Sequence, residues 1–243
     1  MIPLRLLDRI RAVKSPREIS RLRKGAEILE KTLRDVLGII REGISERNLA
    51  RYVERRMKKH GAEALAFPTI AALGENSSEI HHVPSDRKLK RNEIVMLDFG
   101  AAVGGYCSDM TRTLFFGKPP KKFATWYARV LEAQRQAIAK IRDGEKAGAA
   151  DAAARNYLAR FSRRKSFPHG TGHGVGLVIH EWPYLRKNSS DVFRSGMVVT
   201  VEPGIYLKRW GGIRIEDMVL VKKTRCEVLM SAPKELKSII ISP

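Results

Sequence analysis

Residues 93–113 read EIVMLDFGAAVGGYCSDMTRT, and residues 198–221 read VVTVEPGIYLKRWGGIRIEDMVLV. Each stretch contains an apolar strand-like run, an acidic residue two positions before a glycine, a Gly-Gly pair and a second acidic residue. The second acid follows the Gly-Gly pair by four residues in both stretches. Because a Gly-Gly pair between strand-like runs is a turn signal, the sequence predicts two similar β-hairpins. Each hairpin would offer two carboxylates from adjacent strands toward a common centre.

The segments around these hairpins repeat as well. In the first half, Ser15-Pro16-Arg17-Glu18 has the pattern of a capping box and begins an amphipathic helix, which is followed by a helix at about 46–60 and a strand at 67–73. In the second half, helices at about 122–142 and 148–162 precede strands at 174–180, 196–207 and 211–223. The pattern predicts an α+β fold: a lead segment at 1–14, then one domain at 15–243, with pseudo-repeat halves of about 15–118 and 119–243.

The composition places the chain in a broad class. Of its 243 residues 43% are hydrophobic, which is typical of a globular protein. Arginines interrupt the N-terminus before a signal-like apolar run builds up, and no run is long enough to span a membrane, so we expect a cytoplasmic protein. The two cysteines exclude a disulfide framework, and their spacing does not match structural zinc.

The chain is strongly basic, with 46 Lys and Arg against 26 Asp and Glu and a net charge of +20. A charge of this size is one mark of a nucleic-acid or anionic-surface partner. However, the basic residues are spread along the chain in short clusters without aromatic residues between them. This pattern favours a solvated basic surface over a specific nucleic-acid site.

Four acids and a histidine suggest a metal centre. Asp98 and Glu202 lie inside apolar strand-like runs, where an unpaired carboxylate is costly, and four converging carboxylates would repel one another unless a cation lay between them. A nearby imidazole shifts the preference from magnesium or calcium toward manganese, iron, cobalt or zinc. Five ligands fit two ions that share a water or hydroxide. The candidate ligands are Asp98, Asp109, His173, Glu202 and Glu216.

An alternative is that these acids are surface strand residues paired with the abundant lysines and arginines. That interpretation leaves the apolar flanks and the repeated pattern unexplained.

Seven motifs carry a resemblance to a known family. They are HHVPSD, LDFG, SDMTRT, HGTGHGVG, HEWP, EPGIY and GIRIEDMVLV, in this order over residues 81–221. In order and spacing they resemble the M24 metallopeptidases, the family of methionine aminopeptidases, Xaa-Pro aminopeptidases and prolidases. The resemblance covers about residues 12–230. It implies the pita-bread (creatinase/aminopeptidase) fold, in which two pseudo-twofold halves surround a curved antiparallel sheet.

The resemblance also implies a role for each candidate ligand. Asp98 would chelate one divalent ion, His173 and Glu202 would bind the other, and Asp109 and Glu216 would bridge the two. The ions, which could be manganese, cobalt, zinc or iron, would activate a bridging hydroxide that attacks the scissile carbonyl.

Further residues match catalytic positions of the family. Glu202 would accept the proton of the attacking water. His81 matches a histidine that contacts the scissile amide or the leaving group, and His180 matches one that stabilises the tetrahedral intermediate. His169 is similar to a pocket histidine of Xaa-Pro aminopeptidases, with a loop-bracing role as the alternative.

Two residues are expected beside the ligands. Arg214, two positions before Glu216, would share its face of the strand and support the bridging carboxylates. Tyr206 would either form a hydrogen bond near the site or simply pack there.

Within the family, the SDMTRT, EPGIY and RIED motifs resemble the Xaa-Pro-cleaving branch, whereas methionine aminopeptidases usually have histidine at the position of Asp217. We therefore expect a dinuclear metallo-exopeptidase that removes the N-terminal residue of a peptide or dipeptide, with a preference for Xaa-Pro bonds. Xaa-Pro peptidases usually carry an N-terminal domain that helps to build a dimer. Because the catalytic helix begins by Ser15, we expect this domain to be absent, which leaves the homodimer open. The alternatives are methionine aminopeptidase activity, or a non-catalytic relative that binds a partner through its basic surface.

Overall fold

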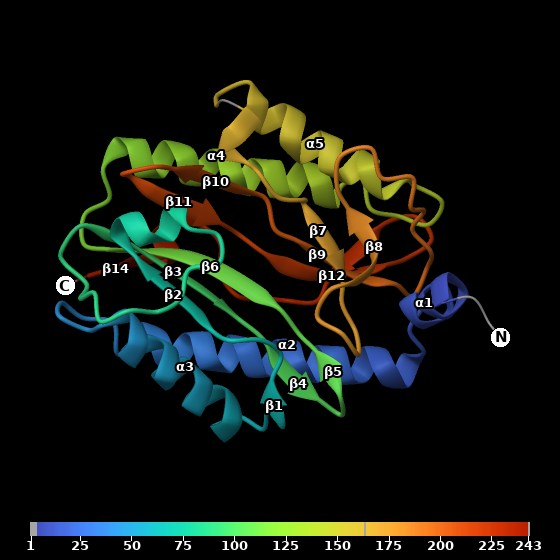
Figure 1. The fold of residues 1–243 in the computed structure, drawn as a ribbon, viewed down its shortest axis with the longest axis horizontal. Helices are drawn as coiled ribbons and strands as arrows, with labels where there is room; N and C mark the ends of the chain where they lie inside the picture. Colours follow the sequence, from blue (N-terminus) through green and yellow to red (C-terminus); the bar gives the residue numbers. More distant parts are fainter. Residues whose placement is uncertain (1–3, 163, 243) are drawn as a thin grey trace.

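A computed structural model describes residues 4–162 and 164–242. Two helical layers enclose the strands, with α2 and α3 on one side and α4 and α5 on the other (Figure 1). α1 lies beside β8 at the edge of the molecule. Within the described ranges, no helix has both the length and the apolar character needed to cross a membrane.

The first half follows the predicted helix-helix-strand order. After α1 (Leu4–Ala12), it contains α2 (Pro16–Leu37), α3 (Glu46–Lys59), β1 (Ala64–Leu65), β2 (Ile70–Leu73), the short 3₁₀ helix η1 (Gly74–Ser78), β3 (Glu93–Phe99), β4 (Ala101–Val103), β5 (Tyr106–Cys107) and β6 (Met110–Phe116).

The second half repeats this order. It contains α4 (Lys121–Ile138), α5 (Ala147–Ala159), η2 (Arg164–Ser166), β7 (Gly172–Gly174), β8 (Glu181–Leu185), β9 (Val198–Val201), β10 (Gly204–Leu207), β11 (Gly211–Arg214), β12 (Asp217–Val221), β13 (Cys226–Val228), η3 (Leu236–Ser238) and β14 (Ile240–Ile241).

The capping box predicted at the start of α2 is present. The backbone N–H of Ser15 donates to the Glu18 carboxylate at 2.8 Å, and the Ser15 hydroxyl accepts from the Glu18 N–H at 3.4 Å. One face of α2 is buried in the core, including Leu22, Leu29 and Val36. This amphipathic face holds the helix against the sheet, since propensity alone stabilises a helix only weakly.

The described strands form four sheets, and the two largest, of four and five strands, are similar. In the first half β3 pairs with β2 and β6, and in the second β9 pairs with β7 and β12. All pairings are antiparallel except that of β14 with β6. The halves are joined where Arg214 N donates to Thr113 Oγ1 at 3.0 Å and Glu216 N donates to Thr111 O at 3.1 Å. The predicted α+β class is therefore confirmed, and both halves have the helix-helix-strand order.

The second Gly-Gly pair was wrongly predicted as a turn. Gly104 and Gly105 do turn between β4 and β5 with positive φ, but Gly211 and Gly212 lie on β11 and the turn is at 208–210. A Cβ on Gly212 would lie 2.1 Å from Ser77 O. The second pair therefore allows η1 to approach the strand closely.

The strand predicted at 174–180 is also wrong beyond its first residue. Only Gly174 belongs to β7, and Val175–His180 forms a loop outside the sheet. The β7–β8 register shifts between His173 and Gly174, so the chain leaves the sheet there and returns at Glu181. An apolar alternation does not distinguish such an irregular loop from a strand.

Candidate metal centre

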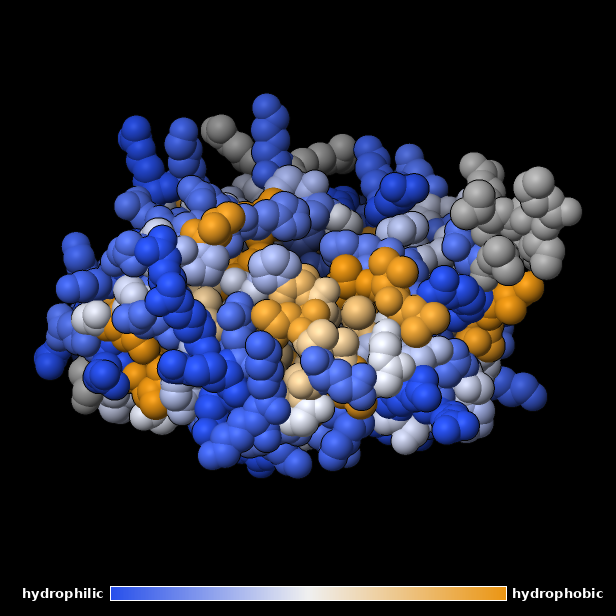
Figure 2. Space-filling view, turned by 60° about the horizontal axis from the view of Figure 1, so that its bottom comes forward, coloured by the Kyte–Doolittle hydropathy of each residue, from blue (hydrophilic) through white to orange (hydrophobic). Residues whose placement is uncertain are grey.

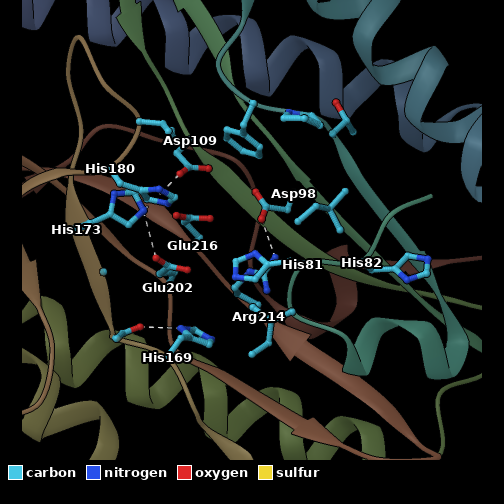
Figure 3. Close-up of a pocket in the computed structure, with 18 of the residues that line it drawn as sticks. His81, His82, Asp98, Asp109, His169, His173, His180, Glu202, Arg214 and Glu216 are labelled. Atoms are coloured by element: carbon cyan, nitrogen blue, oxygen red, sulfur yellow. Dashed lines mark hydrogen bonds and ion pairs between the residues drawn. The ribbon is translucent and has the colours of Figure 1, made fainter.

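All five predicted ligands line one cavity of about 580 Å³ (Figure 3). They are placed by the central strands of both halves. Asp98 is on β3 and Asp109 directly precedes β6; His173 is on β7, Glu202 directly follows β9 and Glu216 directly precedes β12. The duplicated hairpins thus bring the four carboxylates together, and β7 adds the imidazole.

The ligand atoms are close enough to share ions. His173 Nε2 lies 3.4 Å from Glu202 Oε1 and 3.7 Å from Asp109 Oδ2. One ligand atom from each of Asp109, His173 and Glu216 falls within 4.8 Å of the others. His173 Nδ1 lies 3.0 Å from Gly174 O, to which it donates, because a carbonyl oxygen only accepts. This bond leaves Nε2 with its lone pair directed at the carboxylates.

Three carboxylates of the cluster each have one oxygen without a partner among the described residues. Among the described residues, Asp98 Oδ1, Asp109 Oδ1 and Glu216 Oε1 are buried without a hydrogen bond. Burial, followed by mutual repulsion, raises the pKa of Asp109 and Glu216 well above the ordinary values. Burial also raises the pKa of Glu202 to about 8 and lowers that of His173 to about 4. Oxygen atoms of this kind, beside a neutral imidazole, fit divalent ions of the manganese-to-zinc series.

Arg214 connects the ligands to their surroundings. Its Nη2 donates to Asp98 Oδ2 at 2.7 Å and its Nε donates to Thr111 Oγ1 at 3.0 Å. Thr111 Oγ1 in turn donates to Glu216 Oε2 at 2.6 Å. Arg214 was predicted to support Asp109 and Glu216, but the structure pairs it directly with Asp98, and it reaches Glu216 only through Thr111.

His169 and Tyr206 extend this network. Tyr206 OH accepts from Arg214 Nη1 at 2.7 Å and lies 2.8 Å from His169 Nε2. His169 Nδ1 lies 2.7 Å from Gly170 O and donates to it. Burial, assisted by Arg214, lowers the pKa of His169 to about 3, so the neutral ring accepts from Tyr206. His169 therefore lines the cavity and braces Tyr206 at once.

The remaining predicted residues lie on the cavity wall. His81 lines the cavity from the segment after η1. The His180 ring stands edge-on to that of His173, with centroids 4.3 Å apart, and burial lowers the pKa of His180. Beside them is an apolar wall, made up of Phe67, Pro68, Ile70, Ile80, Val83, Pro84 and Ile179.

Sequence reasoning missed the residue that holds the His81 segment. Glu46, at the start of α3, is buried and accepts hydrogen bonds from Leu73 N at 2.9 Å and Ser85 N at 3.0 Å. His82 Nε2 lies 2.8 Å from the same carboxylate, and this histidine lines the cavity apart from the four carboxylates of the cluster (Figure 3). Glu46 looked like an ordinary first-turn acid, and no sequence signal distinguished it.

Comparison with known proteins assigns the chain to a family. Residues 20–223 match the metallopeptidase family M24. The chain belongs to the M24 metallopeptidases. A Pyrococcus horikoshii protein named Xaa-Pro dipeptidase is 42% identical over 227 residues, which is 93% of this chain and 65% of that protein. The chain thus spans slightly less than two thirds of the length of this curated M24 relative.

Solved M24 structures confirm the pita-bread fold. An Xaa-Pro dipeptidase from Bacillus anthracis has a TM-score of 0.93 and 41% identity, covering 97% of this chain and 66% of that one. A prolidase from Pyrococcus furiosus has a TM-score of 0.92 and 39% identity, covering 94% and 68%.

Proposed function

We propose that the chain is a dinuclear metallo-exopeptidase that removes the N-terminal residue of a dipeptide or short peptide, with a preference for Xaa-Pro bonds. The observation that carries this proposal is the convergence of four carboxylates and one imidazole on a cavity in which three buried oxygens lack partners. M24 relatives named Xaa-Pro dipeptidase and prolidase support the substrate class.

The ligands would divide between two ions. Asp98 would hold one ion, His173 and Glu202 the other, and Asp109 and Glu216 both. When bound, the ions supply a nucleophile at neutral pH and polarise the scissile carbonyl.

The chain itself would orient the peptide and move its protons. Glu202 would take the proton of the attacking water and return it to the leaving amine. His180, neutral because its pKa is lowered, would donate a hydrogen bond to the developing oxyanion. His81 would contact the scissile amide, and the apolar wall would accommodate the proline ring and exclude water.

Hydrolysis of a small panel tests this proposal. Metal-stripped protein, reloaded with manganese, cobalt, zinc or iron in turn, is expected to cleave Ala-Pro or Ala-Pro-Ala, and the preferred one separates dipeptidase from aminopeptidase. Cleavage of Met-Ala-Ser alone would replace the proposal with methionine aminopeptidase activity. No cleavage of any of the three by fully loaded protein would contradict both.

A second candidate function is the binding of nucleic acid through α3. Arg47, Arg51, Arg55 and Lys59 are exposed at intervals of four residues and form a stripe of cations about 6 Å apart. Like charges at this spacing destabilise an isolated helix. In Figure 2 the side of the molecule that carries α2 and α3 is turned toward the viewer. Hydrophilic side chains are crowded over the lower part of this view. No exposed large apolar residue among those described lies on α3, so binding would be purely electrostatic.

Fluorescence anisotropy with a labelled duplex tests this second function. Binding is expected to weaken steeply with salt. Replacing Arg51, Arg55 and Lys59 by glutamine should weaken it more than the same change at Lys118, Lys121 and Lys208, three exposed lysines outside α3. Equal losses in the two triple variants would indicate a diffuse basic surface and not a site.

A further inference from the structure

A nearly buried ion pair joins the N-terminal segment to the start of β8. Lys14, between α1 and α2, places its Nζ 2.5 Å from Oε1 of Glu181, the first residue of β8. The two side chains are 1% and 14% exposed. Lysine and glutamate are rarely buried unless they are paired. Neither residue belongs to the ligand set or lines the cavity, so the proposed function does not account for the pair.

The lysine is attached to the rigid centre of the second half. Lys14 N donates to Gly196 O at 2.9 Å, and Val13 forms a β-bridge with Met197. Met197 leads directly into β9, at whose end Glu202 lies. The backbone of Lys14 is therefore held relative to β9, and the contact with Glu181 directs its ammonium group.

The glutamate reaches over the loop that ends in His180. A Cβ on Gly176 would lie 2.6 Å from Glu181 Oε1 and 2.7 Å from Oε2, so the carboxylate covers this glycine closely. On the other side of the loop, Cys107 N of β5 donates to Gly176 O at 2.7 Å. The Val175–His180 loop is thus held between β5 and the Glu181 carboxylate.

His180 directly precedes Glu181, and its ring is the one that stands against His173. The backbone is held at both ends of the loop, where Val175 N donates to Val198 O at 3.1 Å and Glu181 pairs with Gly174. Between these ends no residue belongs to a strand, so the placement of His180 also depends on the contacts of Gly176 and Glu181. We propose that Lys14 is a positioning residue: by anchoring Glu181, it holds His180 against His173 and the carboxylate cluster. The catalytic consequence rests on the proposed function, in which His180 contacts the substrate.

Four variants test the role of the pair. Lys14→Met removes the charge and keeps the stem, Glu181→Gln removes the partner charge, and Lys14→Arg retains the cation. The double variant Lys14→Met/Glu181→Gln buries no unpaired charge, so it remains informative if a single variant fails to fold. Arg56→Met is the matched control, because it breaks a partly buried ion pair with Asp35 between α3 and α2, away from the cavity.

For Ala-Pro hydrolysis, we expect Lys14→Met and the double variant to lower kcat about tenfold or more, with metal content unchanged and KM within about twofold. Lys14→Arg should restore most of kcat, and Arg56→Met should not alter it. When Lys14→Met is added to His180→Ala, kcat should fall by less than about twofold further, because both changes act through the same histidine. Losses that multiply, or an equal loss in Arg56→Met, would overturn the positioning role.

A measurement that needs no activity separates this inference from the proposed function. The NMR chemical shifts of the His180 ring are expected to change in Lys14→Met and in the double variant, and to remain the same in Arg56→Met. If the signal moves but the unmodified protein hydrolyses no peptide, the positioning stands and the proposed function fails. An unmoved signal in both variants overturns the positioning even in an active enzyme.

Discussion

The two carboxylate-bearing hairpins share a plan and differ in their surroundings. Asp98 and Asp109 in the first half, and Glu202 and Glu216 in the second, reach the same cavity from matching strands. The second half adds an imidazole on β7, whereas the first half adds His81 on a segment outside the sheet. Duplication therefore explains the symmetric carboxylates, and the differences between the halves supply the histidines.

The largest expected effect comes from removing one of the two acids that we propose to bridge the ions. Glu216→Ala should abolish both metal loading and hydrolysis, because the remaining carboxylates cannot hold two ions. Asp109→Ala, the matching change in the first half, should do the same. Metal content by mass spectrometry and Ala-Pro hydrolysis check both variants. Glu132→Ala, on α4 away from the cavity, is the control. An active Glu216→Ala enzyme would contradict the bridging role and the equivalence of the two halves.

The histidine outside the sheet should affect activity without affecting the ions. His81→Ala is expected to lower kcat/KM about 10²–10³-fold, since one transition-state hydrogen bond is lost. Metal content should remain that of the unmodified protein. Loss of metal from this variant would show that His81 is a ligand. The proposal that only the second half supplies an imidazole ligand would then be wrong.

The two glycine pairs should differ in what they tolerate. Gly212→Ala would force a Cβ against Ser77 O, and we expect it to lower the free energy of unfolding by about 3 kcal/mol. Gly105→Ala meets no close atom, and its positive φ should cost only about 1 kcal/mol. Urea unfolding measures both. Equal losses of unfolding free energy would mean that Gly212 is not needed for the close approach of η1 to β11.

The last effect depends on pH and concerns His82 and Glu46, the pair that holds the His81 segment. Burial alone lowers the pKa of His82, but hydrogen bonds with Glu79 and Glu46 outweigh it and raise the pKa above 6.5. Burial raises the pKa of Glu46, but its hydrogen bonds with Ser85, His82 and Leu73 outweigh this and hold it below 4.5. The stabilisation by His82 is therefore lost as pH rises through its raised pKa, and that by Glu46 is lost as pH falls below 4.5.

His82→Ala should accordingly cost about 1–3 kcal/mol, and the difference from the unmodified protein should be largest between about pH 4.5 and 6.5. Chemical unfolding at several pH values checks this. A difference that does not change between pH 5.5 and pH 9 would show that the ion pair contributes nothing beyond packing.

Much of the fold could be predicted because its signals are local. The Ser15 capping box, the two helices of each half and the turn at Gly104 and Gly105 each depend on neighbouring residues, and all appear in the structure. The turn at Gly211 and Gly212 and the strand after Gly174 were wrong for a common reason. Their conformation depends on Ser77 O and on the β7–β8 register, and both are set by parts of the chain distant in sequence.

By itself, the sequence predicted the five residues that meet at the cavity, because duplicated spacing and acids within apolar runs are properties of the chain alone. Only the tertiary structure decided the partners of the residues that hold them in place. Arg214 pairs with Asp98, Glu46 anchors the His81 segment and Lys14 meets Glu181 across 167 positions of sequence. Pairs of this kind have no local signature, because burial makes them favourable only after distant strands and helices have come together.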